Sequence, residues 1–181
     1  KLWGKAKDNN NFLYLTFSSG IGGAAFNQGK IVTTSGGNGI EAGHLEINSD
    51  YRLPCGCGGI NHWESYVSGF NTPQFLKEWA GKNHLEINFD GSDIYKIFQA
   101  INAGNPIAIR FFDEVMRIHN QGIDFYYQKF QPEIILIGGS IYLHNQKLFD
   151  SKLEKVNIIR PATFGDEASL VGAAAAYIIQ S

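Results

Sequence analysis

The chain has 181 residues, 18% of them charged, and a formal net charge of −2. This length accommodates one domain with a core of ordinary size, or two very small domains. Lysine and arginine are scattered along the chain, which argues against a nucleic-acid interface or a polybasic membrane patch. No apolar run approaches the roughly 20 residues that a transmembrane helix requires, so a membrane span is not expected.

The two cysteines lie one residue apart, and the chain has no others. This usage fits a reducing, cytoplasmic compartment better than a disulfide-bonded secreted domain. The residues that follow Lys1 contain neither the apolar core of a signal peptide nor an initiator methionine. We therefore expect a cytoplasmic protein of which this chain is a part.

The chain is predicted to begin with a β-meander. The apolar run at 12–17 predicts a buried strand, and glycine-rich turns separate it from strands at 24–26 and 30–34. The turn after the first strand can present backbone N–H groups and hydroxyls to an anion such as a phosphate. A glycine-rich turn is more often only a hairpin, and no Gly-Lys-Ser/Thr follows that would define a Walker A loop.

Four candidate zinc ligands follow within 20 residues. His44, Cys55, Cys57 and His62 offer two imidazoles and two thiolates, and a tetrahedral structural zinc site takes four such ligands. Nitrogen and sulfur favour zinc over magnesium or calcium, which take oxygen. The glycines between the cysteines and His62 let the backbone wrap around a small centre. The alternative is a pair of small buried cysteines beside a structural histidine, because Cys-x-Cys is weaker evidence than paired Cys-x-x-Cys motifs.

The second half of the chain is predicted to alternate helices and buried strands. Residues 133–137 form an apolar strand buried on both faces, as in a parallel or mixed α/β sheet. Gly138 and Gly139 follow it, at the strand end where open α/β sheets bind ligands. His119, alone on a long helix, is predicted to be structural. The remaining predicted elements are a short strand at 44–47, helices at 63–67, 73–80, 90–103, 106–129 and 166–179, and a strand at 157–159.

Five motifs in this order resemble the ROK family (repressors, open reading frames and sugar kinases). They are Ser-Ser-Gly-Ile-Gly-Gly, Glu-Ala-Gly-His, Cys-Gly-Cys-Gly-x-x-Asn-His-x-Glu, Pro-Glu-Ile-Ile-Leu-Ile-Gly-Gly and Ala-Ser-Leu-Val-Gly-Ala-Ala. Each is weak alone, but the ordered combination is specific, and the resemblance covers nearly the whole chain. It implies an α/β, ribonuclease H-like domain of the actin/hexokinase ATPase type, with a mixed sheet flanked by helices.

The resemblance places residues 1–181 as the larger, carboxyl-terminal domain of such a protein. The smaller amino-terminal ATPase domain, with its Asp-x-Gly-Gly-Thr phosphate loop and its catalytic aspartate, has no counterpart in this chain. No catalytic residue is therefore expected here, and the chain alone should be inactive. In the family the last helix returns to the small domain, so residues 167–181 are expected to pack against it.

The same resemblance assigns roles to individual residues. Glu41, His44 and Glu64 match residues that hydrogen-bond sugar hydroxyls, a task that suits carboxylates because charge-assisted bonds are strong. His44 is also a zinc ligand in the family, so its ring would serve both the metal and the sugar. By the same resemblance, Ser19, Gly20 and Gly22 would bind the ATP phosphates, and Gly138 and Gly139 would bind the adenosine.

The chain departs from the family motif at two positions. The family usually has Cys-Gly-x-x-Gly-Cys, whereas Asn61 and His62 stand at the last glycine and cysteine. Histidine is itself a zinc ligand, so the resemblance extends to a His₂Cys₂ site with a longer fourth ligand. Asn61 must accept a conformation that glycine adopts at lower cost.

The resemblance implies that the intact protein is an ATP-dependent hexose kinase. It would transfer the γ-phosphoryl group of ATP, with Mg²⁺, to a hydroxyl of glucose or a close relative, and would carry structural Zn²⁺. The resemblance also implies that the protein forms a homo-oligomer, namely a dimer. The alternative is the effector-binding domain of a sugar-responsive ROK repressor, which an upstream helix-turn-helix would identify. A third interpretation is an interaction domain that has lost catalysis.

Overall fold

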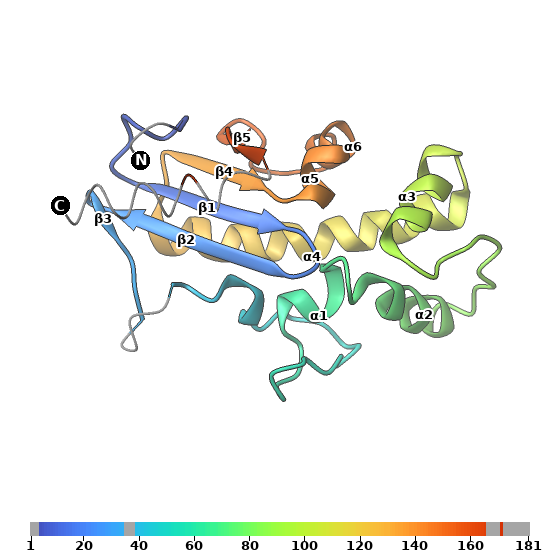
Figure 1. Cartoon of the computed structure of the whole chain (residues 1–181). Helices are drawn as coiled ribbons and strands as arrows, with labels where there is room; N and C mark the ends of the chain where they lie inside the picture. The colour runs from blue at the N-terminus through green and yellow to red at the C-terminus, as the bar shows by residue number, and fades with distance from the viewer. Residues whose placement is uncertain (1–3, 35–38, 166–170, 172–181) are drawn as a thin grey trace.

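The computed structural model describes residues 4–34, 39–165 and 171, and its centre is a five-stranded mixed sheet (Figure 1). The strand order is β3-β2-β1-β4-β5. The first three strands pair antiparallel, while β4 pairs parallel with both β1 and β5. The strands are β1 (Phe12–Phe17), β2 (Ile21–Asn27), β3 (Lys30–Ile31), β4 (Ile134–Gly138) and β5 (Ile159–Pro161).

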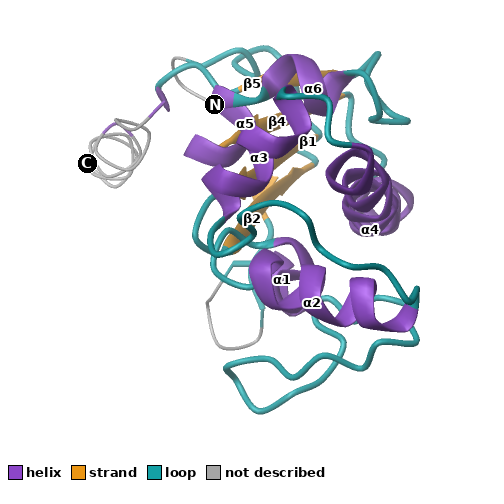
Figure 2. Ribbon diagram, turned by 90° about the vertical axis from the view of Figure 1, so that its right-hand side faces the viewer, coloured by secondary structure: helices purple, strands orange, loops and turns teal. Residues whose placement is uncertain are grey.

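Helices flank this sheet, and the longest of them, α4, runs along one of its faces (Figures 1 and 2). α1 packs against both α4 and α2, so the segment that precedes α1 is anchored to the helical layer. α5 and α6 follow directly after β4. The helices are α1 (Trp63–Val67), α2 (Thr72–Lys82), α3 (Ile94–Asn102), α4 (Pro106–Phe130), α5 (Ser140–His144) and α6 (Gln146–Asp150), with a short 3₁₀ helix at Ala42–His44.

The alternation in β1 separates two apolar clusters. Leu13, Leu15 and Phe17 point into the main core, while Phe12 packs with Leu136 in a smaller cluster. The parallel pairing with β4 sets Thr16 opposite Gly138. The carboxyl ends of β1 and β4 therefore lie at the same edge of the sheet.

The main core is rich in aromatic side chains around α1 and α4. Trp63 is fully buried, and it lies so close to Gly122 of α4 that a Cβ at this glycine would overlap the indole ring. His119, also on α4, is buried with its ring centroid 4.3 Å from that of Phe17 and 5.5 Å from that of Phe149. Its burial lowers the pKa of His119 to about 3, so the ring is neutral. Its position in the core agrees with the structural role predicted for it.

Several predicted elements differ from the structure. No regular strand forms at 44–47: His44 ends the 3₁₀ helix, and Glu46 makes one isolated bridge with His62. β3 is shorter than predicted, β5 begins two residues later, and α5 and α6 were not predicted. The helical periodicity of the sequence predicts Phe125 on the inner side of α4, but its side chain is 45% exposed. The helix predicted at 166–179 lies outside the described residues apart from position 171.

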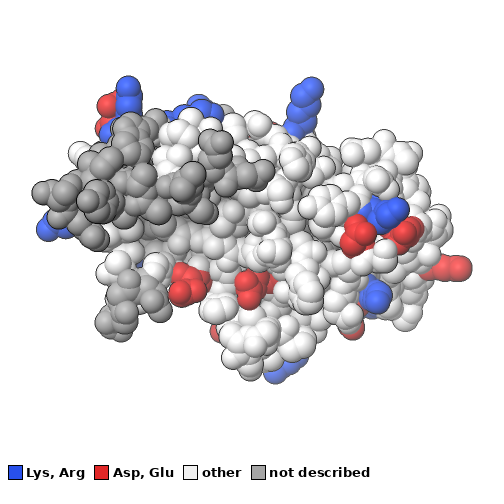
Figure 3. Space-filling model, in the orientation of Figure 1, with Lys and Arg blue, Asp and Glu red and all other residues white. Residues whose placement is uncertain are grey.

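Two observations agree with what the composition predicts about membrane spans and basic patches. Among the described helices, none is both long and apolar enough to cross a bilayer. On the face of the molecule in Figure 3, the positive side chains of the described residues stand apart from one another instead of forming a continuous basic patch.

Candidate active site

The four predicted zinc ligands lie together. One ligand atom from each of His44, Cys55, Cys57 and His62 can be chosen so that all four lie within 4.8 Å of one another. Within this cluster, Cys57 Sγ and His62 Nδ1 are 3.2 Å apart. In a tetrahedral zinc site with bonds of about 2.0–2.3 Å, ligand atoms are about 3.3–3.8 Å apart. The donor set and its spacing therefore fit a Zn²⁺ ion after small side-chain movements.

A tight turn brings the two cysteines toward His62. The N–H of Gly58 donates to the Cys55 carbonyl at 2.9 Å, and the N–H of Cys55 donates to the Gly59 carbonyl at 2.8 Å. Gly58 has a φ of 89°, and a Cβ at Gly59 would overlap the His62 ring. Glycine therefore suits both positions, since it adopts the φ of Gly58 at low cost and leaves room for the His62 ring beside Gly59.

The Cys55 thiol is buried, and this burial raises its pKa. Its Sγ is 3.4 Å from Glu64 Oε1, where the protonated thiol donates to the carboxylate. A bound divalent cation would reverse this preference, because a coordinating thiol is deprotonated by the metal charge. Cys55 would therefore be a thiolate only with a metal bound.

Two of the three predicted sugar-binding residues are in contact. Glu64 Oε1 is 3.7 Å from His44 Nε2, and both side chains are partly accessible. The contact depends on Gly43, where a Cβ would overlap the Ile21 carbonyl and lie 2.9 Å from Glu64 Oε2. Glu41 is exposed at the start of the same 3₁₀ helix, with a φ of 44°. One short turn and the first turn of α1 therefore carry all three side chains.

The predicted phosphate-binding turn lies next to Glu64. A Cβ on Gly20 would be 3.5 Å from Glu64 Oε2. Ser18 donates its N–H to the Gly20 carbonyl at 3.0 Å, which closes the turn between β1 and β2, and Ser19 is exposed at its tip. Gly22 instead lies within β2, paired with Thr16. A phosphate at this turn and a hydroxyl held by Glu64 would be neighbours.

The second predicted nucleotide-binding segment lies at the same edge of the sheet. Gly138 ends β4, and Gly139 follows with a φ of 86°. A Cβ at Gly139 would overlap the carbonyl oxygen of Phe17, so the end of β4 approaches the end of β1 at a distance that only glycine permits. The parallel pairing of the two strands therefore brings both glycine motifs together.

Residues 68–70 support the turn and were not anticipated from the sequence. The N–H of Gly69 donates to Ser18 O at 2.8 Å, and that of Phe70 donates to Ser19 O at 3.1 Å. Phe70 is 83% exposed beside this turn. The available signal was the Ser-Gly pair that ends α1, four residues after Glu64.

Solved structures with the same fold identify the class of protein. A solved ROK hexokinase from Thermus thermophilus matches with a TM-score of 0.72 and 26% identity, covering 94% of this chain and 58% of that one. A ROK glucokinase from Streptomyces griseus, solved with glucose and AMPPNP, matches with a TM-score of 0.66 and 24% identity over 92% of this chain and 60% of that one. The fold is therefore the ribonuclease H-like fold of actin/hexokinase-type ATPases, as predicted.

The ROK family model matches residues 1–179, and the chain belongs to the ROK family. A glucokinase from Pyrobaculum calidifontis is 35% identical over an alignment of 176 positions, which covers 91% of this chain and 56% of that protein. The chain thus spans 56–60% of the length of these three proteins.

Proposed function

We propose that this chain is the larger, carboxyl-terminal domain of an ATP-dependent hexose kinase that phosphorylates glucose or a close relative. The observation that carries the proposal is the position of Glu64. One of its oxygens faces His44 and the other lies beside Gly20 of the glycine turn. A sugar hydroxyl bound to this carboxylate would meet a phosphate held by the turn. The glucokinase from Pyrobaculum calidifontis, at 35% identity, supports this assignment.

The sugar would be held by Glu41, His44 and Glu64. A carboxylate can accept bonds from two neighbouring hydroxyls, and charge-assisted bonds are about twice as strong as neutral ones. His44 would use one ring nitrogen for the sugar and the other for the metal, which fixes its tautomer and orientation. Zn²⁺, when bound, supplies structural cross-linking of the loop and holds both cysteines as thiolates.

The nucleotide would lie along the adjacent sheet edge. Ser19, Gly20 and Gly22 would border the phosphates, and Gly138 and Gly139 would admit the adenosine. In phosphoryl transfer, catalysis is mostly positioning and charge stabilisation, with Mg²⁺ bridging the phosphates. The aspartate that accepts the hydroxyl proton would come from outside these 181 residues. The chain alone would therefore not catalyse phosphoryl transfer.

The repressor alternative shares this fold and these sugar-binding residues. The 35% identity to a glucokinase favours the kinase. A cytoplasmic location agrees with a metal centre built on reduced cysteines, and a homodimer is our proposal for the assembly.

The test is a coupled ATP/ADP assay of the intact protein with glucose, comparing Glu64→Gln with the wild type. Replacing the carboxylate removes two charge-assisted bonds, so kcat/KM should fall about 100-fold or more. Zinc content, measured in parallel, should not change. The matched control is Glu86→Gln, an exposed carboxylate between α2 and α3, which should retain wild-type activity. Absence of glucose phosphorylation by the wild type, or full activity in Glu64→Gln, would refute the proposal.

A further inference from the structure

We propose that Asn61 is the positioning residue of the metal centre, because it ties together the three segments that carry its ligands. This inference rests on the zinc site proposed above. Asn61 immediately precedes His62, and it stands where the ROK motif usually has glycine. Its side chain therefore adds contacts that a glycine at this position cannot make.

The main chain of Asn61 pairs with two segments at once. Its N–H donates to the Leu53 carbonyl at 2.9 Å, two residues before Cys55. Its carbonyl accepts from the N–H of Ile47 at 2.7 Å, three residues after His44. Isolated bridges continue both pairings, between positions 46 and 62 and between positions 54 and 60. The segment around Asn61 is thus the middle of a small three-stranded arrangement that carries His44, Cys55 and His62.

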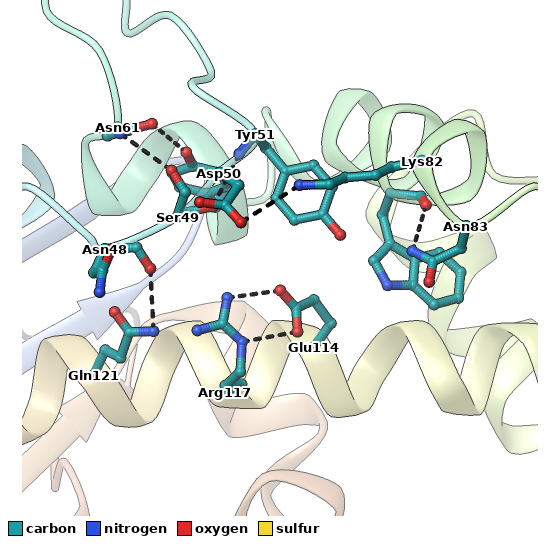
Figure 4. Close-up of polar contacts among 12 residues, drawn as sticks. Asn48, Ser49, Asp50, Tyr51, Asn61, Lys82, Asn83, Glu114, Arg117 and Gln121 are labelled. Carbon is teal, nitrogen blue, oxygen red and sulfur yellow. Dashed lines mark hydrogen bonds and ion pairs between the residues drawn. The ribbon is translucent and has the colours of Figure 1, made fainter.

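The side chain of Asn61 fixes this arrangement to the helical layer. Its Oδ1 accepts from the hydroxyl of Tyr66, on α1, at 2.5 Å. Its Nδ2 donates to the carbonyl of Ser49 at 3.3 Å (Figure 4). Tyr66 is fully buried, and the same hydroxyl accepts from the N–H of Leu53 at 3.4 Å. Loss of the Asn61 amide would therefore leave a buried hydroxyl without its short acceptor, which is costly.

The loop bonded to Asn61 is itself held to the helical layer. Gln121 of α4 donates to the Asn48 carbonyl at 3.4 Å, and Lys82 of α2 lies 3.7 Å from Asp50 (Figure 4). Together with α2 and α4, residues 48–51 line a polar cavity of about 340 Å³. Asn61 thus links the metal loop to a segment held by two helices.

The backbone of Asn61 is left-handed, with a φ of 59°. Asparagine enters this region more readily than most residues, although glycine does so at lower cost. Asparagine is therefore a residue that can combine the required φ with an amide side chain. His62 reaches further than a cysteine would, so the position of its ring depends on how firmly residue 61 is held.

The experiment measures metal binding by the chain for the wild type, Asn61→Gly, Asn61→Asp and Tyr66→Phe. Asn61→Gly keeps the left-handed backbone and removes both side-chain bonds, and Tyr66→Phe removes only the hydroxyl donor. Asn61→Asp keeps an acceptor for Tyr66 and loses the donor to Ser49. The matched control is Gln131→Gly, a second left-handed residue with a side-chain bond, at the end of α4. Zinc affinity is measured by competition with a chromophoric chelator, and ligand geometry by the visible absorption of the Co²⁺-substituted protein.

Zinc affinity should fall about 10-fold in Asn61→Gly, as for other outer partners of metal ligands, and less in Asn61→Asp. The Co²⁺ bands should shift and weaken in Asn61→Gly and Tyr66→Phe as His62 loses its fixed position, while Gln131→Gly matches the wild type. Wild-type affinity and Co²⁺ spectra in both Asn61→Gly and Tyr66→Phe would overturn the inference about Asn61 alone. A wild-type chain that binds neither Zn²⁺ nor Co²⁺ would overturn the metal site itself.

Discussion

Replacing Cys55 by serine is expected to abolish zinc binding. The wild-type chain should carry about one zinc per chain by elemental analysis, as a four-ligand site requires. Serine can still donate a hydrogen bond to Glu64, as the Cys55 thiol does at 3.4 Å, so the substitution removes the metal ligand with little other change. Zinc affinity should fall more than about 100-fold, since loss of an outer partner alone costs about 10–100-fold. Tm should fall as well, because metal binding is coupled to folding of the loop.

The control separates loss of the metal from the chemical change to serine. Ala103→Ser introduces the same hydroxyl at the exposed end of α3 and should leave zinc content and Tm unchanged. Chelation of zinc from the wild type should lower Tm by about as much as Cys55→Ser does. A wild-type protein purified without metal, or a Cys55→Ser variant that retains one zinc, would contradict the four-ligand site.

The folded chain is expected to lose stability on acidification because of His119. Neither ring nitrogen has a hydrogen-bond partner among the residues that the structure describes, and burial lowers the pKa of His119 from 6.5 to about 3. Below pH 6.5 the histidine is therefore protonated in the unfolded chain but stays neutral in the folded chain. The contribution of His119 to the free energy of unfolding is intact above pH 6.5 and is lost as pH falls toward 3. Between pH 7.5 and 4.5 the free energy of unfolding should fall by about 2–3 kcal/mol from this residue.

Denaturant unfolding at pH 7.5 and 4.5 tests this expectation with His119→Phe. Phenylalanine fits the surrounding rings of Phe17, Trp63 and Phe149 and cannot be protonated. The difference in stability between the two pH values should shrink by about 2–3 kcal/mol in this variant. His144→Gln, at an exposed position on α5, should behave as the wild type. The other ionisable groups are the same in the wild type and in His119→Phe, so an unchanged pH dependence in His119→Phe would contradict the buried neutral histidine.

The candidate metal ligands could be picked out from the sequence because they lie close together along the chain. His44, Cys55, Cys57 and His62 span 19 positions, and glycines between them leave few ways to arrange the loop except as a compact turn. The structure brings their ligand atoms within 4.8 Å of one another, as this spacing predicted. Local spacing was therefore sufficient for this part of the site.

The contact between Glu64 and Gly20 required the fold. These residues are far apart in the chain, and they meet because α1 packs beside the β1–β2 turn, where Gly69 and Phe70 bond the carbonyls of Ser18 and Ser19. No local pattern encodes that packing. The family resemblance predicts roles for Glu64 and Gly20, and the structure adds that the two residues lie side by side.

The elements predicted poorly are short ones. α5 and α6 have five residues each, too few for apolar periodicity to stand out from chance. The strand predicted at 44–47, from the alternating polarity of these residues, is not formed beyond an isolated bridge at Glu46, and the 3₁₀ helix Ala42–His44 just before it was not predicted. Long elements such as α4 were predicted nearly to the residue, from Asn105, which caps its first turn, to Phe130.

Asn61 illustrates a residue whose significance only the structure gives. From the sequence it was a departure from a glycine motif, with a conformational cost. In the fold its main-chain and side-chain groups bond four other residues, and these lie in the segments that position the metal ligands. Compared with the glycine usual in the motif, Asn61 has less backbone freedom but makes anchoring hydrogen bonds.

Calorimetric titration of glucose into the intact protein, before and after removal of zinc, tests the central claim most directly. In our proposal His44 belongs to both the metal cluster and the sugar site, and Glu64 contacts both His44 and Cys55. We predict that the zinc-loaded protein binds glucose, that chelation abolishes this binding, and that added Zn²⁺ restores it. A metal-free protein that binds glucose as tightly as the loaded one would contradict the account.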